Sequence, residues 1–190
     1  MDSGASGSVI RAQICLYLGL VIAILLKPHG LAADSGISFY GIYLRTVIPF
    51  AFGLLGSAFC YLRAALSIRR QDLRPLRFAL VAAVALTIVI AATPYSVSSL
   101  FDWLHTSAGS ALFSLQLLLS GWLIVHLRYA RIIVLLTAIE LLAGIACAYY
   151  LHGSQGFLIQ FQILFQIAFG ALLIYSLHRL EATAHSFRSS

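Results

Sequence analysis

The chain has 190 residues, of which 61% are hydrophobic and only 9% are charged, and its mean hydropathy is +0.96. A soluble domain carries about 25% charged residues, so this composition excludes a water-soluble globule and indicates an integral membrane protein. Six helices of about 20 residues would use about 120 residues, which leaves only short loops and tails. We therefore expect residues 1–190 to form a single all-α transmembrane domain, a bundle of six helices.

Six apolar segments follow one another along the chain, and none carries the polar face that a soluble amphipathic helix needs. We expect the six transmembrane helices to span about 9–26, 43–65, 78–95, 105–127, 132–151 and 157–177.

The first apolar segment has a second interpretation. Arg11 precedes the apolar run and Leu-Ala-Ala follows it at 31–33, an order similar to that of a signal peptide. Lys27 and Pro28 lie between the run and these small residues and fit a cleavage site poorly. We therefore expect the first helix to be retained.

The charges are distributed unevenly between the connections. The chain has 12 Lys or Arg residues against 6 Asp or Glu residues. Ten of the 12 basic residues lie at the N-terminus, in the second and fourth connections and in the C-terminal tail, and five of these fall within 63–77. The positive-inside rule then predicts that both termini are cytoplasmic. Since no basic stripe is interleaved with exposed aromatic residues, the excess indicates orientation and anionic lipid headgroups as partners, and no nucleic acid.

Cofactor chemistry is poorly supported by the residue spacing. The three cysteines are isolated within apolar runs and form neither a disulfide framework nor a zinc motif. The single lysine, Lys27, lies at a helix end, which excludes a retinal-type Schiff base in the membrane core. His105 and His126 are 21 residues apart, or about 31 Å along a helix. Both would therefore lie at the membrane edges, whereas the haems of transmembrane b-type cytochromes are bound within the bilayer. We predict no cofactor and no metal.

One acidic residue, Glu140, falls within an expected span, close to the middle of the fifth helix. A charged residue at the bilayer centre costs about 2.5–3.5 kcal/mol on insertion scales, so Glu140 is expected to face the bundle interior. Gln116 and Gln166 lie at the same depth on two other helices. We predict that these three residues form a polar mid-membrane layer that binds a ligand or ion. The alternative is that they hydrogen-bond the helices together.

A second group of polar residues collects at the expected outer ends of the helices. Arg45, Asp102, His105 and His152 are predicted to form the mouth of a vestibule for a polar or anionic headgroup, with Arg45 and Asp102 as an ion pair. The alternative is an interfacial belt of snorkelling side chains. Asp102 has a second explanation, because Ser99 and Asp102 have the spacing of a helix capping box.

No established catalytic motif is present. The chain has no G-x-S-x-G sequence and no glycine-rich phosphate loop, and Ser107 lies only two residues after His105, so on a helix the two side chains point in different directions. Whether the protein is an enzyme stays open, and we expect that it is not. The leading hypothesis is a membrane protein that binds or passes a small ligand, ion or lipid.

Two alternatives come from other functional classes. The first is a structural or accessory subunit of a larger membrane complex, or a homo-oligomer. The second is a membrane-embedded hydrolase or transferase with an outer-face site at His105, His152 and Asp102. Under each of these hypotheses, the short loops of the protein favour a bacterial inner membrane as its location.

Three short motifs together resemble those of a known group. They are Ile-Ser-Phe-Tyr-Gly at 37–41, Asp-Trp-Leu-His at 102–105, and Gly109 with Phe113 just after it. With the six-helix layout, they are similar to uncharacterised bacterial relatives of the Frag/DRAM/Sfk membrane proteins. That resemblance implies a role in lipid handling or membrane organisation. The resemblance implies no catalytic mechanism, and His105 is the one residue of this chain to which it would assign a role.

Overall fold

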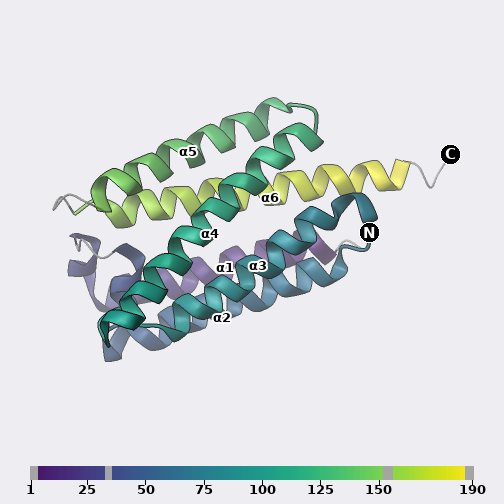
Figure 1. Cartoon of the computed structure of the whole chain (residues 1–190). Coiled ribbons are helices and arrows are strands. Elements are labelled where there is room, and N and C mark those ends of the chain that lie inside the picture. Colours follow the sequence, from purple (N-terminus) through teal and green to yellow (C-terminus); the bar gives the residue numbers. More distant parts are fainter. Residues whose placement is uncertain (1–3, 33–35, 152–155, 187–190) are drawn as a thin grey trace.

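The computed structural model describes residues 4–32, 36–151 and 156–186 (Figure 1). Within these residues there is no β-strand, and the α-helices are α1 (Gly4–Leu26), α2 (Leu44–Ser67), α3 (Arg74–Ala92), α4 (Ser99–His126), α5 (Arg131–Leu151) and α6 (Leu158–Ser186). The connections hold the 3-10 helices η1 (Pro28–Ala32), η2 (Gly36–Gly41) and η3 (Gln71–Leu73). Six helices are long and apolar enough to cross a membrane. The expected all-α bundle of an integral membrane protein is confirmed.

The first and last helices are longer than their apolar runs. α1 begins at Gly4 rather than at Val9, and α6 continues to Ser186 rather than ending near Leu177. The two extensions stabilise each other, because the buried Glu181 carboxylate accepts hydrogen bonds from the Ser6 hydroxyl at 2.8 Å and the Ser6 backbone N–H at 3.3 Å. Glu181 thus satisfies a free N–H group in the first turn of α1, where a negative charge is favourable.

α4 also begins earlier than expected, at Ser99 instead of His105. Its N-cap is Ser98, whose side chain accepts a hydrogen bond from the Phe101 N–H at 3.2 Å. The expected capping box of Ser99 and Asp102 is therefore wrong, because the N-cap is Ser98 and the residue three positions after it is Phe101, while Asp102 lies in the first turn of the helix. α3 ends at Ala92 because Pro94 disfavours helical geometry in the residue before it.

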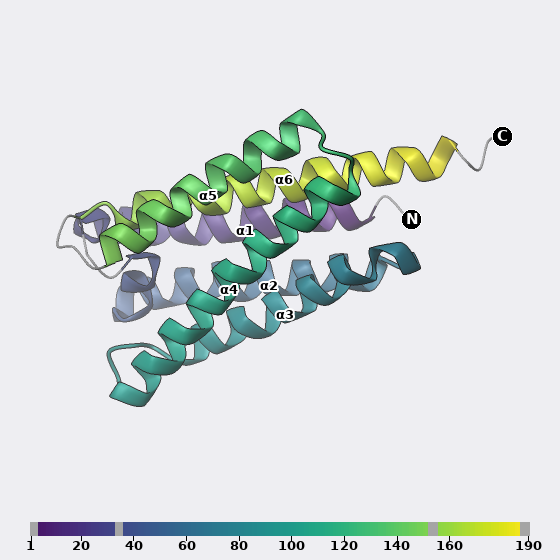
Figure 2. The same ribbon diagram turned by 45° about the horizontal axis from the view of Figure 1, so that its top comes forward.

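The two termini lie at one end of the bundle, which we call the terminus end, together with the α2–α3 and α4–α5 connections (Figure 1). The 3-10 helices η1 and η2, the α3–α4 connection, the last turn of α5 and the first turn of α6 lie at the opposite end, which we call the far end. α1 packs on α2 and α6, α3 packs on α2 and α4, and α5 packs chiefly on α6. α4 crosses obliquely from α3 toward α5 and α6 in both views (Figures 1 and 2).

The closest helix packing is between α1 and α2 and depends on two glycines. A Cβ atom on Gly19 would lie 2.4 Å from the Pro49 carbonyl oxygen and 2.7 Å from Cα of Gly53. Small residues at such crossings let two backbones approach and gain van der Waals contact, which drives helix association within a membrane. No larger residue fits at Gly19 unless the helices separate.

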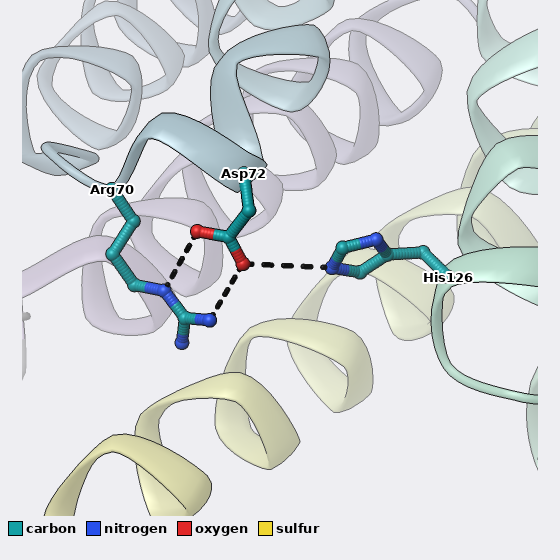
Figure 3. Close-up of polar contacts among 3 residues, drawn as sticks. All are labelled: Arg70, Asp72 and His126. Carbon is teal, nitrogen blue, oxygen red and sulfur yellow. Dashed lines mark hydrogen bonds and ion pairs between the residues drawn. The ribbon is translucent and has the colours of Figure 1, made fainter.

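The main apolar core lies toward the terminus end, where all six α-helices contribute buried residues. The connection between α2 and α3 is tied there to the end of α4. Arg70 Nη2 lies 2.6 Å from Asp72 Oδ2, and His126 Nε2 lies 4.0 Å from the same oxygen (Figure 3). The His126 ring stacks on Trp122 with 4.5 Å between ring centroids. Because the ion pair is exposed, it orients the connection more than it stabilises the fold.

The turn from α4 to α5 places two non-glycine residues in the left-handed region, Arg128 at φ 54° and Tyr129 at φ 56°. The Tyr129 N–H donates to the Ile124 carbonyl at 2.8 Å, and the Arg128 N–H donates to the Val125 carbonyl at 3.2 Å. These two bonds form a Schellman motif, in which Arg128 occupies the position that usually holds glycine.

The α1–α2 crossing predicts a steric effect at Gly19. The Gly19→Ala variant should lose about 1–3 kcal/mol of stability from overpacking. In size-exclusion chromatography after heating in detergent, its monodisperse peak should disappear at a lower temperature than that of the wild type. Gly121→Ala is the matched control, because a Cβ there would have no neighbour within 4 Å. Equal thermal stability of the two variants would contradict the close crossing.

The left-handed turn predicts a stabilising substitution. Arg128→Gly should raise stability by about 1 kcal/mol, because glycine adopts this conformation without the Cβ clash. Arg128→Ala removes the same side chain but keeps the clash, so it should leave the thermal unfolding midpoint near that of the wild type. If both variants shift the midpoint alike, the effect comes from the lost arginine side chain instead.

Candidate functional site

A cavity of about 480 Å³ lies at the far end, between α4 on one side and α5 and α6 on the other. We call it the far-end cavity. It is lined by Ser38, Tyr95, Asp102, His105, Thr106, Gly109, Ser110, Phe113, Ser114, Leu117, Gly144, Cys147, Ala148, Leu158 and Gln162. This volume lies within the range of about 300–1,000 Å³ that is usual for small-molecule sites.

The cavity exists because α4 and α5 meet at the terminus end and diverge toward the far end (Figure 2). Several residues along the diverging walls are small, including Gly109 on α4 and Gly144 and Ala148 on α5. Side chains of this size do not bridge the widening space. On the α4 wall, Thr106, Ser110 and Ser114 are exposed, so the cavity reaches the outer surface of the bundle.

The lining changes in polarity along α4. Asp102 and His105 lie in the first two turns of the helix, and Ser38 and Gln162 join them from η2 and α6. Phe113 and Leu117 lie two to four turns further along α4 and are apolar. The Phe113 ring stacks on Phe165 of α6 with 4.1 Å between the ring centroids. The cavity therefore has charged and amide groups at its mouth and a mostly apolar interior, in which Ser110 and Ser114 are the polar residues of the α4 wall.

His105 uses both ring nitrogens. Nδ1 lies 2.8 Å from the Thr93 carbonyl oxygen, and Nε2 lies 2.6 Å from Ser38 Oγ. Because a carbonyl oxygen only accepts, Nδ1 carries a proton and donates it. In the neutral imidazole Nε2 is then an acceptor, so the Ser38 hydroxyl donates to it. The Tyr95 ring packs edge-on against the imidazole.

Ser38 is positioned by the docking of η2 on α6. The Ile37 N–H donates to Gln162 Oε1 at 2.7 Å. Gly36 has φ 65°, and a Cβ atom there would lie 2.4 Å from the same oxygen, so glycine satisfies both the backbone conformation and the space. The Tyr40 side chain is fully buried, and this burial raises the pKa of its hydroxyl. Thr46 Oγ1 donates to the Tyr40 carbonyl at 2.7 Å and holds the other end of η2.

The predicted polar layer consists of two separate pairs. Gln116 and Gln166 exchange two amide hydrogen bonds of 3.2 and 3.1 Å. One turn further along α4, Ser120 Oγ donates to Glu140 Oε2 at 2.6 Å. The structure thus brings the two glutamines together, whereas the Glu140 carboxyl group accepts its hydrogen bond from Ser120.

Neither pair belongs to the far-end cavity. Gln116 and Gln166 line a second, smaller cavity of about 140 Å³, which also reaches His105 and Gln162. Glu140 is completely buried and lines neither cavity, and its Oε1 has no hydrogen-bond partner among the described residues.

The four residues predicted for the outer mouth have different positions. Asp102 and His105 line the far-end cavity, whereas Arg45 is exposed at the start of α2 and does not. Within the described part of the chain no ion pair joins Arg45 to Asp102, so that predicted contact is not formed. His152 lies outside the described residues.

Sequence analysis missed Ser38, Gln162 and Ser120 as members of these sites. Two of them carried a periodic signal, because Ser120 is four residues after Gln116 and Gln162 is four residues before Gln166. Ser38 carried none, since it is 67 residues from His105. Sequence analysis considered Ser107 instead, which lines neither cavity.

In the ranges that the structure covers, no group of three or more His, Cys, Asp or Glu residues is placed to hold one metal ion. This absence does not test the expectation that the protein needs no cofactor, which stays a prediction.

Comparisons with protein-family models, curated proteins and solved structures found no match to this chain.

The Ser120–Glu140 contact predicts a coupled effect on stability. Ser120→Ala leaves the buried carboxyl group without its donor and should cost about 1–3 kcal/mol. The double variant Ser120→Ala/Glu140→Met removes both polar groups and should recover most of that loss. Glu140→Met completes the cycle, and heating in detergent followed by size-exclusion chromatography gives the thermal midpoints of the wild type and the three variants. A loss in the double variant equal to the sum of the two single losses would show that the pair does not stabilise α4 against α5.

Proposed function

We propose that this integral membrane protein binds one lipid-like amphiphile in the far-end cavity. The observation that carries the proposal is the polarity of that cavity, in which Asp102, His105 and Gln162 lie at one end and Phe113 and Leu117 at the other. A ligand site is usually apolar with a few polar groups that fix orientation. A molecule with a polar head and a hydrocarbon chain matches both parts.

The polar head would lie against groups of both hydrogen-bonding types. Asp102 supplies a carboxylate acceptor, and the Gln162 amide nitrogen supplies a donor, since the amide oxygen already accepts from Ile37. The hydrocarbon chain would extend along Phe113, Leu117 and Gly144. Because the α4 wall is exposed at Ser110 and Ser114, the ligand would enter sideways from the bilayer instead of crossing it.

The orientation of the protein in the membrane is part of the proposal. The basic residues concentrate at the terminus end, in particular along 63–77. By the positive-inside rule, we place both termini in the cytoplasm and the far-end cavity at the outer leaflet of a bacterial inner membrane. The resemblance to the Frag/DRAM/Sfk proteins points to the same class of ligand.

We assign the mid-membrane pairs a packing role. Gln116 and Gln166 satisfy each other, and Glu140 is enclosed against Ser120 and lines neither cavity. Buried polar side chains that bond across helices stabilise membrane bundles. The proposed ligand site is therefore the far-end cavity, and passage of an ion through the polar layer is not part of the proposed function.

Filling the cavity should abolish binding. Ala148 is exposed and lines the far-end cavity, so Ala148→Phe adds a ring to the space without crowding the core. The protein is placed in nanodiscs with a diazirine-bearing phosphatidylethanolamine, and the lipid crosslinked to the cavity peptides of α4 and α5 is measured. We expect this crosslinking to fall about tenfold or more, which corresponds to a loss of about 1.4 kcal/mol in the binding free energy of the lipid. Ala111→Phe is the matched control, since Ala111 is exposed on α4 and lines neither cavity. Equal crosslinking in both variants would contradict the proposed site.

A further inference from the structure

The Ser38–His105–Thr93 contacts have the geometry of an activated nucleophile. The Ser38 hydroxyl donates to His105 Nε2 over 2.6 Å, and the opposite ring nitrogen is fixed by a 2.8 Å bond to a backbone carbonyl. Serine nucleophiles are activated by an adjacent base that a third group orients. Here the Thr93 carbonyl fixes the tautomer that leaves Nε2 free to accept the serine proton.

The position of this pair separates it from an ordinary structural contact. Both Ser38 and His105 line the far-end cavity, and both also line the smaller cavity beside it. Both side chains are only half-buried. The nucleophile therefore lies at the polar mouth, where the head of an amphiphile would meet its hydrocarbon chain.

We infer that Ser38 is a nucleophile activated by His105 and that the far-end cavity accepts a carboxylic ester of a hydrocarbon chain. This inference rests on the proposed function, because the apolar part of the cavity would hold the acyl chain. It differs from the hydrolase considered from the sequence, which relied on His105, His152 and Asp102 and contained no serine.

The inferred ester hydrolysis has two steps, the acylation of Ser38 and the hydrolysis of the acyl-serine. In the first, Ser38 Oγ attacks the ester carbonyl carbon while its proton passes to His105 Nε2. The bond from that carbon to the alcohol oxygen then breaks, and the Nε2 proton passes to the departing alcohol. In the second, a water molecule gives a proton to Nε2 and its oxygen attacks the acyl-serine, which releases a carboxylic acid and returns the proton to Ser38.

One further residue supports the negative charge that develops in these steps. The Gln162 amide nitrogen has no acceptor among the hydrogen bonds of the described residues, although its oxygen is held by Ile37. Side-chain amides of this kind stabilise the oxyanion of acyl transfer. Asp102 lies three residues before His105 on α4 and lines the same cavity.

An alkyl fluorophosphonate bearing a fluorophore tests the nucleophile directly on the full chain in nanodiscs. We expect time-dependent labelling, with the adduct mapped to Ser38 by peptide mass spectrometry. Ser38→Ala should abolish labelling, and His105→Gln should slow it about 100-fold or more, the usual contribution of a general base. Ser107→Ala is the matched control and should label at the wild-type rate, because Ser107 lines neither cavity.

The wild-type adduct decides the assignment even if Ser38→Ala fails to fold. An adduct on another residue, or none at all, would overturn the nucleophile. If the diazirine lipid still crosslinks to the cavity in that case, the proposed function stands and only the ester chemistry fails. If crosslinking is lost as well, both fail. Turnover of 4-nitrophenyl octanoate should follow the labelling, with kcat/KM lowered about 100-fold or more in His105→Gln.

Discussion

The oblique path of α4 is the constraint on which the rest of this structure depends. At the terminus end α4 joins α5 through a tight left-handed turn and contributes Leu119 and Leu123 to the main core. Toward the far end it leaves α5 and α6 and packs on α3 (Figure 2). A helix that diverges from its neighbours leaves a space that only large side chains can fill, and several of the residues that α4 and α5 present there are small, among them Gly109, Gly144 and Ala148. The far-end cavity follows from this geometry.

Polar contacts hold α4 along this path. Gln116 reaches α6, Ser120 reaches α5, and His105 reaches the Thr93 carbonyl and η2. In an apolar environment an unpaired polar group costs several kcal/mol, so each of these side chains has few favourable positions other than the observed one. The pairs thereby fix both the angle and the rotation of α4. For Gln116 and Ser120 this packing role accounts for the hydrogen bonds that they make, whereas His105 also lines the far-end cavity.

The far-end cavity is assembled by segments that are distant in the chain. η2 supplies Ser38, α4 supplies His105 and α6 supplies Gln162, while the Thr93 carbonyl after α3 holds the His105 ring in place. Each is held by a contact with another of these segments rather than by its own helix. A site of this kind is rigid where the contacts are made and open where α4 and α5 diverge, which suits the binding of a ligand that enters from the bilayer.

The sequence by itself determined the class of fold and the number of helices, because a chain with so few charges must bury its backbone hydrogen bonds in apolar helices. It also singled out Glu140 and Gln116, which are buried, Gln166, which is half-buried, and His105, since polar residues in apolar runs are costly. Only the tertiary structure decided which of them meet. Depth along a helix can be counted from a sequence, but helix rotation and crossing angle cannot, so Glu140 was grouped with the glutamines although its hydrogen bond is to Ser120. Ser38 had no periodic signal, because its contact with His105 arises from the docking of η2 on α6 and not from any spacing in the chain.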